Sequence, residues 1–252
     1  RVALNIHYDM GQMSYALATI NIACGYDYDW EGARLGNIYT EEAYKLLKRL
    51  EFKQMLSRFD LEAPANEKLE KLFVKTADLG EAENLFQKAE KAGRLAFALI
   101  REEGRVLALS MTLSEQEVFV LPVQGLLTES WLLGRLSKAL DLAEEIDCLG
   151  LKGELLFLKT ENREAYADAE IAAYLLNPLK DSYSCEDLAG EYLGLSIPSR
   201  AELFGKEKLS KVLEERAEEF RIFAGYGSYV LYTVMPVLKK RLLETGMEEL
   251  YR

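Results

Sequence analysis

Residues 95–123 read LAFALIREEGRVLALSMTLSEQEVFVLPV. Apolar side chains recur there with a period near two over three runs, at 95–100, 106–113 and 117–123, which is typical of β-strands. Short polar segments, EEG and SEQ, separate the runs and carry turn signals. The stretch therefore predicts a meander of three strands.

Helical patterns surround this meander. An amphipathic segment at 128–144 follows it, then a fourth strand candidate, IDCLGLK (146–152), and a helix at 165–176. Another helix is expected at 81–92, before the meander. Strands joined as hairpins, followed by a strand that comes after a helix, predict the α/β class with a mixed sheet flanked by helices.

The last helical pattern spans 207–243 and contains residues that disturb helices. Gly225 and Gly227 allow either a close approach of another element or a break. Pro236 removes a backbone N–H and predicts a break in the helix.

The N-terminal part is predicted to be a small all-helical module at 1–60. A helical pattern begins at Thr40, whose side chain suits an N-cap, and its apolar face runs to Phe52. We place a linker at 61–80, because the segment DLEAPANEK loses the apolar period and contains a proline. A sheet domain at 81–245 then follows.

Composition excludes several classes of protein. The chain has 42 acidic and 31 basic residues, a net charge of -11, which repels a polyanion unless basic residues gather on one surface. The three cysteines, Cys24, Cys148 and Cys185, are widely spaced and indicate reduced thiols rather than disulfides or a metal clip. No apolar run approaches the ~18 residues of a membrane span, and we expect a cytoplasmic protein with no membrane partner.

Three phrases of the sequence resemble segments of bacterial DNA polymerase I, a family A DNA polymerase, and they occur in that family's order. They are ARLGNIYTEEAYKLLKRLEFKQMLSRF (33–59), AAYLLNPLKDSYSCEDLAGEYLGLSIPSR (172–200) and ETGMEELYR (244–252). The chain also begins without an initiator Met. The resemblance covers most of the chain and implies an interior fragment of a longer polymerase.

The resemblance assigns each part of the chain to a polymerase domain. It implies that 1–60 is the C-terminal part of a 5′ nuclease domain and that 81–245 is a 3′-to-5′ exonuclease-like domain with a ribonuclease-H-like fold. Residues 246–252 would begin the connection to a polymerase domain. The parent is then expected to be a DNA-directed DNA polymerase of replication and repair that uses Mg²⁺, with DNA and the adjoining domains as partners.

Active exonuclease domains of the family that the sequence resembles bind two divalent cations through clustered carboxylates. The carboxylates come from the first strand, from the segment after the fourth strand and from a late helix, which also supplies a tyrosine. The matching positions in this chain are Ala98, Ile100, Glu154, Phe223 and Gly227, so at most one carboxylate is retained. The resemblance therefore implies a vestigial, structural domain with no catalytic residue, no metal site and no cofactor of its own.

Two other functions remain open from the residues. The first is an active 3′-to-5′ exonuclease that uses Glu102, Glu103 or Glu154 as substitute metal ligands. The second is a free-standing acidic interaction module, which would need no metal ligand. We interpret Glu154 as a solvated residue at a helix start in preference to a relic ligand. Asp168 is interpreted as a helix cap.

Two side-chain patterns have both a functional and a structural interpretation. Tyr226, Tyr229 and Tyr232 recur at spacing three, which is more typical of a packing stripe than of a platform for base stacking. Basic residues on and after the helix that begins at Thr40 suit contact with a DNA backbone about as well as a solvated helix face. They are Lys45, Lys48, Arg49 and Lys53.

Overall fold

The computed structural model divides into two units, Arg1–Leu61 and Glu62–Arg252. It describes residues 7–21, 25, 29–34, 36, 38–50, 52, 55 and 66–251. None of the helices in these ranges is both long enough and apolar enough to cross a membrane.

The described part of the first unit contains two helices and non-helical segments outside them. Helix α2 spans Tyr8–Ala18 and helix α3 spans Glu41–Arg49. The predicted N-cap is confirmed, because the Oγ1 atom of Thr40 accepts a hydrogen bond from the backbone N–H of Ala43 at 3.2 Å. Helix α3 ends at Arg49, before the predicted end at Phe52.

The second unit is built on a mixed six-stranded sheet with the strand order β1-β4-β3-β2-β5-β6. The predicted meander is confirmed. Strands β2 (Arg94–Glu102), β3 (Arg105–Ser114) and β4 (Glu117–Pro122) pair antiparallel in sequence. Ala98 lies opposite Ser110, and Ser110 lies opposite Val120 on the next strand.

Three short strands complete the sheet in parallel pairings. They are β1 (Phe73–Lys75) beside β4, β5 (Glu145–Cys148) beside β2, and β6 (Tyr166–Asp168) beside β5. These strands correct the sequence prediction in three places. Strand β1 lies within the predicted linker, β6 replaces the start of the predicted helix at 165–176, and β5 ends at Cys148. Strands of three or four residues are too short to show a period, which is why the sequence pattern missed or misplaced them.

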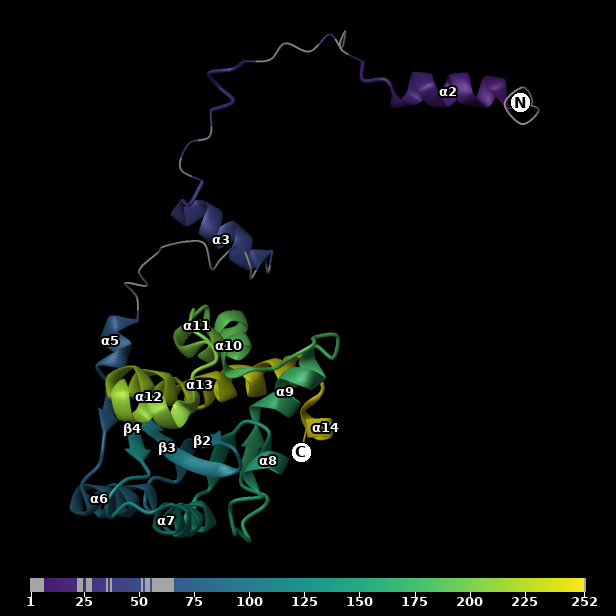
Figure 1. Cartoon of the computed structure of the whole chain (residues 1–252). Coiled ribbons are helices and arrows are strands. Elements are labelled where there is room, and N and C mark those ends of the chain that lie inside the picture. The colour runs from purple at the N-terminus through teal and green to yellow at the C-terminus, as the bar shows by residue number, and fades with distance from the viewer. Residues whose placement is uncertain are drawn as a thin grey trace. The chain divides into compact units, whose positions relative to one another are not determined.

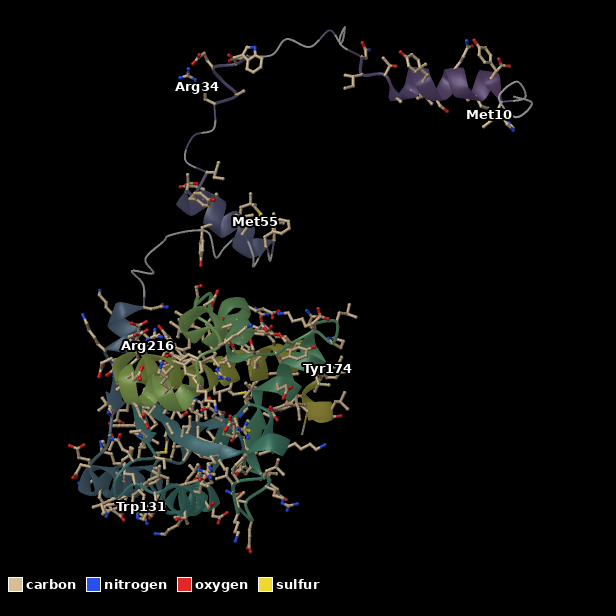
Figure 2. The ribbon with its side chains drawn as sticks, in the orientation of Figure 1. Met10, Arg34, Met55, Trp131, Tyr174 and Arg216 are labelled. Carbon is tan, nitrogen blue, oxygen red and sulfur yellow. The ribbon has the colours of Figure 1, made fainter. Side chains whose placement is uncertain are left out.

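Helices cover both faces of the sheet (Figure 1). Helices α6 (Leu79–Ala89) and α7 (Glu129–Leu142) lie on one face, close to their predicted positions. Phe86 of α6 and Trp131 of α7, which is labelled in Figure 2, meet edge to face with ring centroids 5.6 Å apart. This pair joins the two helices over the core that they share with the inward side chains of β2 and β3.

The opposite face carries the long helix α13 (Ala217–Glu244) and the helices that pack around it. The shorter elements are α5 (Glu67–Glu70), α9 (Ala169–Leu176), α10 (Cys185–Leu188), the π-helix η1 (Ala189–Leu193), α11 (Arg200–Phe204), α12 (Leu209–Glu215) and α14 (Glu248–Tyr251). Helix α8 (Leu151–Glu154) follows β5, and its Leu151 packs against the core under α6 and α7. Buried hydroxyls fix α13 on the sheet, since Ser228 Oγ lies 2.6 Å from Ser110 Oγ and 2.8 Å from Thr112 Oγ1.

The predicted break at Pro236 does not occur, because α13 continues through this residue. A proline has no N–H for the carbonyl four residues earlier, which here is that of Tyr232. The Nη2 atom of Arg94 donates a hydrogen bond to this carbonyl at 2.7 Å. A strand arginine therefore provides the donor that the helix lacks.

The close approach predicted at the two glycines of α13 is confirmed. A Cβ atom at Gly225 would lie 2.5 Å from Cδ2 of Phe73 on β1, and one at Gly227 would lie 3.0 Å from the Cβ of Ala98 on β2. Glycine at these positions lets the helix backbone lie directly on the sheet.

Strand β1 is held at the sheet edge by side chains of α13. Arg221 Nη1 donates to the carbonyl oxygens of Glu70, at 3.0 Å, and of Phe73. The hydroxyl of Tyr226 donates to Glu70 Oε1 at 2.7 Å, and Asn66 Nδ2 donates to the carbonyl of Ser196 at 2.7 Å. The segment predicted as a linker is therefore fastened to the unit from α5 onward.

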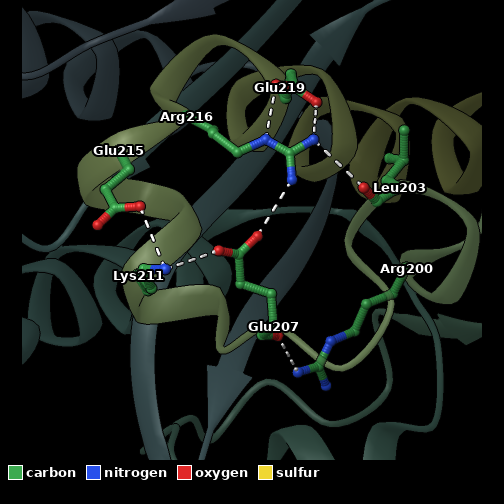
Figure 3. A network of polar contacts seen from close by, with 7 residues as sticks. All are labelled: Arg200, Leu203, Glu207, Lys211, Glu215, Arg216 and Glu219. Carbon is green, nitrogen blue, oxygen red and sulfur yellow. Dashed lines mark hydrogen bonds and ion pairs between the residues drawn. The ribbon is translucent and has the colours of Figure 1, made fainter.

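A network of ion pairs joins α11, α12 and α13 (Figure 3). Arg216 stands between the last two helices and donates to the carbonyl of Leu203 at 3.3 Å, to Glu207 Oε2 at 3.2 Å and to Glu219 Oε1 at 2.8 Å. Lys211 adds ion pairs of 3.2 Å to Glu207 and 3.4 Å to Glu215. These contacts tie α11 and α12 to the start of α13, whose residues 223–231 line the candidate site.

Candidate functional site

A cavity of about 220 Å³ lies between β2 and α13. Its wall includes all five positions that the sequence matches to the metal-binding set of active exonucleases. They are Ala98 and Ile100 on β2, Glu154 at the end of α8, and Phe223 and Gly227 on α13. Residues from α10 and from the segment before α11 also line the pocket, among them Cys185, Glu186, Ile197 and Pro198. The structure thus brings together positions separated by as much as half of the chain.

Apart from Arg101, the strand side of this pocket is apolar. Along β2, alternate side chains point to opposite faces, so that Phe97 and Leu99 enter the core under α6 and α7. Ala98 and Ile100 consequently face α13. A methyl and a branched alkyl group thus stand at the two positions that the sequence resemblance matches to carboxylates, and neither group can bind a cation.

Glu154 is the buried carboxylate of the pocket, with only 5% of its surface exposed. Its Oε1 atom accepts a hydrogen bond from Arg101 Nη2 at 3.0 Å, whereas its Oε2 atom is buried without a partner among the described residues. Burial raises the pKa of Glu154 to about 7, with a smaller contribution from the Asp168 carboxylate, while Arg101 opposes the rise. The interpretation of Glu154 as a solvated residue is therefore wrong.

Asp168 caps a helix, as the sequence predicts. Its Oδ1 atom accepts from the N–H groups of Glu170 at 2.9 Å and Gly150 at 3.0 Å. Its Oδ2 atom accepts from Leu151 N–H at 2.7 Å. Both oxygens thus serve the backbone at the starts of α8 and α9.

Glu102 and Glu103, two of the possible substitute ligands, point to α12. Glu102 accepts from the N–H of Leu209 at 2.7 Å and from the N–H and hydroxyl of Ser210 at 3.1 and 2.7 Å. The Ser210 hydroxyl is the main cause that lowers the pKa of Glu102, aided by the two N–H groups and opposed by desolvation. Glu103 pairs with Lys208 at 2.8 Å. These two acids secure the start of α12 on the turn after β2.

The pocket residues do not fit a divalent metal pair. Mg²⁺ takes oxygen ligands in near-octahedral geometry, and a two-metal site clusters several carboxylates. Glu154, the buried carboxylate of this pocket, already forms an ion pair with Arg101. Across the described part of the chain, no group of three or more His, Cys, Asp or Glu side chains is placed to hold a metal ion.

The three tyrosines of α13 form a packing stripe, the arrangement that the sequence pattern favours over a platform for base stacking. Tyr226 is buried and meets Phe73 edge to face at 5.1 Å, and Tyr229 and Tyr232 pack against the same core. The thiols of Cys148 and Cys185 have pKa values raised above the ordinary range, mainly by burial, which keeps them protonated. Cys24 lies outside the described residues.

The predicted DNA-contacting residues are only partly covered by the structure. The structure describes the backbone of Lys45, Lys48 and Arg49, which lie in α3, but not their side chains. Lys53 lies outside the described residues. Their contact with DNA stays a prediction.

Sequence reasoning missed two arginines, Arg94 and Arg101, which open and nearly close strand β2. Arg94 donates to Asp147 Oδ2 at 2.7 Å, pairs with Glu145 at 3.1 Å and lies 4.1 Å from the ring centroid of Tyr232. Their one signal in the sequence is a charged residue at each end of a buried strand run.

Comparisons with known proteins agree with this architecture. No family model matches the chain, and no curated protein sequence matches it. Solved structures do. The catalytic core of RRP6 from Trypanosoma brucei superposes with a TM-score of 0.56 at 15% identity, over 70% of this chain and 48% of that one. The chain thus spans about half the length of this neighbour.

Two further structures share the fold. The Nibbler EXO domain from Aedes aegypti has a TM-score of 0.51 at 10% identity, over 71% of this chain and 94% of that one. The POL domain of Pol1 from M. smegmatis, in complex with a DNA primer-template and dNTP, has a TM-score of 0.51 at 16% identity, over 71% of this chain and 29% of that one. At these identities the likeness concerns the fold alone, and the fold is the ribonuclease-H-like mixed sheet of the exonuclease structures, flanked by helices.

Proposed function

We propose that this chain is a structural portion of a DNA-polymerase-I-like protein of DNA replication and repair, and that its exonuclease-like unit is catalytically silent. One observation carries the second part of the proposal. The pocket at the positions that the sequence resemblance matches to a proofreading site is walled by Ala98, Ile100, Phe223 and Gly227, and its buried carboxylate is paired with Arg101.

The assignment to a polymerase is supported by two independent features. The sequence phrases at 33–59, 172–200 and 244–252 resemble polymerase I in their order. The fold is shared with a chain that carries a polymerase domain. In this proposal the unit holds neighbouring polymerase and nuclease domains in relation, and the parent contacts DNA and requires Mg²⁺.

The proposal predicts that the purified chain leaves labelled single-stranded DNA intact in the presence of Mg²⁺ or Mn²⁺. Phosphodiester hydrolysis of this type depends on metal-bound water, and removing the metal ligands removes most of the acceleration. Gel analysis of the labelled strand over hours checks this, with an active exonuclease in the same buffer as the positive control. Progressive shortening that Glu154→Gln abolishes would establish the rival function, an exonuclease with a substitute ligand.

The helical module provides a second prediction. Replacing Lys45, Lys48, Arg49 and Lys53 with glutamine is expected to weaken DNA binding and to reduce the slope of log K against log salt. The slope falls by about 0.9 for each duplex phosphate contact that is lost. Fluorescence anisotropy with a duplex at several salt concentrations measures both quantities.

A matched control keeps the same change in net charge. Glutamine at four lysines of the second unit, Lys91, Lys152, Lys159 and Lys206, should leave the slope close to that of the unchanged chain. Equal effects of the two sets would show that only net charge matters and would contradict a DNA-facing helical module.

A further inference from the structure

The pocket between β2 and α13 contains its own positive charge. Arg101 Nη2 donates to Glu154 Oε1 and Nη1 donates to the carbonyl of Gly153, both at 3.0 Å. The guanidinium also lies over the ring of Phe157, 5.3 Å from its centroid. Contacts from residues 153–157 therefore fix the head group of Arg101 against the pocket wall.

Glu154 requires such a partner because it is buried. A carboxylate with 5% exposure loses most of its hydration, and a buried charge persists in the folded state only when it is paired. In a hydrolytic pocket of this fold the partner would be a metal ion. Here the partner is covalently part of the chain and arrives from the same strand that carries Ala98 and Ile100.

The pocket also offers few ligands for a metal ion. Where α13 crosses β2, a Cβ atom at Gly227 would lie 3.0 Å from that of Ala98, so a longer side chain at Gly227 would force a shift. Two metal ions need a separation of about 3.5–4 Å and a shell of oxygen ligands. The neighbouring carboxylate, Asp168, has both oxygens bound by backbone N–H groups.

We infer that Arg101 is the resident cation of this pocket: its guanidinium neutralises Glu154 in place of a divalent metal ion and makes the folded unit independent of such ions. This inference rests on the proposed function, because it compares the pocket with the metal-binding site of an active exonuclease. It is tested on a different property, thermal stability in the absence of DNA.

The first test is a double-mutant comparison. At pH 8, above the pKa of about 7 that Glu154 has in the folded chain, Arg101→Ala should lower Tm by about 5 °C or more, because it leaves a buried carboxylate unpaired. Adding Glu154→Gln should recover most of this loss, since no unpaired charge remains. Arg105→Ala, which removes an exposed arginine at the start of β3, serves as the control and should change Tm little.

The second test adds the metal alone. Millimolar MnCl₂ should change the Tm of the unchanged chain and of Glu154→Gln by the same small amount. A Tm rise in the unchanged chain that Glu154→Gln abolishes would overturn the inference, because it would show a metal bound at Glu154 beside Arg101.

The double variant decides the question even if Arg101→Ala does not fold. It must fold if the unpaired carboxylate is the main cost of losing Arg101, and a double variant as unstable as Arg101→Ala would show that the arginine acts through packing alone. Shortening of DNA by the unchanged chain would contradict the proposed function and would leave these stability results unaffected. The two failures are therefore distinguishable.

Discussion

Replacing Arg94 with methionine is expected to lower the free energy of unfolding at pH 8 by roughly 3–5 kcal/mol, the usual cost of breaking a buried ion pair on one side. Asp147 has no exposed surface, and Arg94 donates to its Oδ2 atom through Nε at 3.1 Å and Nη2 at 2.7 Å. The same guanidinium satisfies the Tyr232 carbonyl opposite Pro236. Its loss would leave a buried charge and a buried carbonyl without donors.

The effect of Arg94→Met should depend on pH with a definite sign. Burial raises the pKa of Asp147 from 3.8 to about 7, against the opposing effect of Arg94. The folded chain therefore holds a proton that the unfolded chain releases, and this group makes stability fall as pH rises from about 4 to about 7. In the variant the rise in pKa is larger, so we expect a smaller loss of stability at pH 5 than at pH 8.

Urea unfolding at both pH values measures this dependence. The double variant Arg94→Met with Asp147→Asn is the matched control, because it removes the buried charge and should lose little further stability on going from pH 5 to pH 8. A loss that is equal at the two pH values in the single variant would contradict the assignment of the effect to Asp147.

Replacing Gly225 with alanine is expected to have the second large effect. The new Cβ atom would lie 2.5 Å from Cδ2 and 2.6 Å from Cγ of Phe73, whose side chain is buried and cannot swing into solvent. Overpacking of this kind costs about 1–3 kcal/mol, and it must also outweigh the gain of about 1 kcal/mol that alanine brings to a helix interior. We expect a net loss of stability, with β1 displaced from β4.

Amide hydrogen exchange combined with urea unfolding checks this prediction. The N–H groups of 73–76 should lose protection in Gly225→Ala before those of the meander do. Gly134→Ala on α7 is the control, since nothing lies within 4 Å of its added Cβ atom, and this change should leave stability equal or slightly higher. Adding Phe73→Val to Gly225→Ala should restore part of the loss. Unchanged stability of Gly225→Ala would show that α13 can move away from β1 at little cost.

The sequence predicts those parts of the fold whose patterns repeat over several residues. Strands β2 to β4 and helix α7 show two or more periods of alternating or helical apolar residues, and their predicted limits are close to the observed ones. Strands β1 and β6 have three residues each, which is less than two periods, so pattern alone does not identify them.

The prediction at Pro236 failed for a different reason. A local rule states what the helix loses at a proline but not what a distant strand can supply, and the compensating donor, Arg94, is 138 residues away from the Tyr232 carbonyl that it reaches. Arg101 was missed in the same way, since its partner Glu154 is 53 residues further along the chain. The resemblance did place five positions around one pocket, but the charge that balances the pocket depends on tertiary contacts.

Because β1 pairs with β4 and α5 is hydrogen-bonded to α13, a force applied at the start of the second unit acts on the edge of its sheet. Tension that reaches the chain at residue 66 passes into β4 through a parallel ladder of three residues, which is far weaker than the longer antiparallel ladders of the meander. We expect that ladder to break first, together with the hydrogen bonds that Arg221 and Tyr226 donate to Glu70 of α5. Such tension would then cost the sheet one edge strand and leave the antiparallel meander paired.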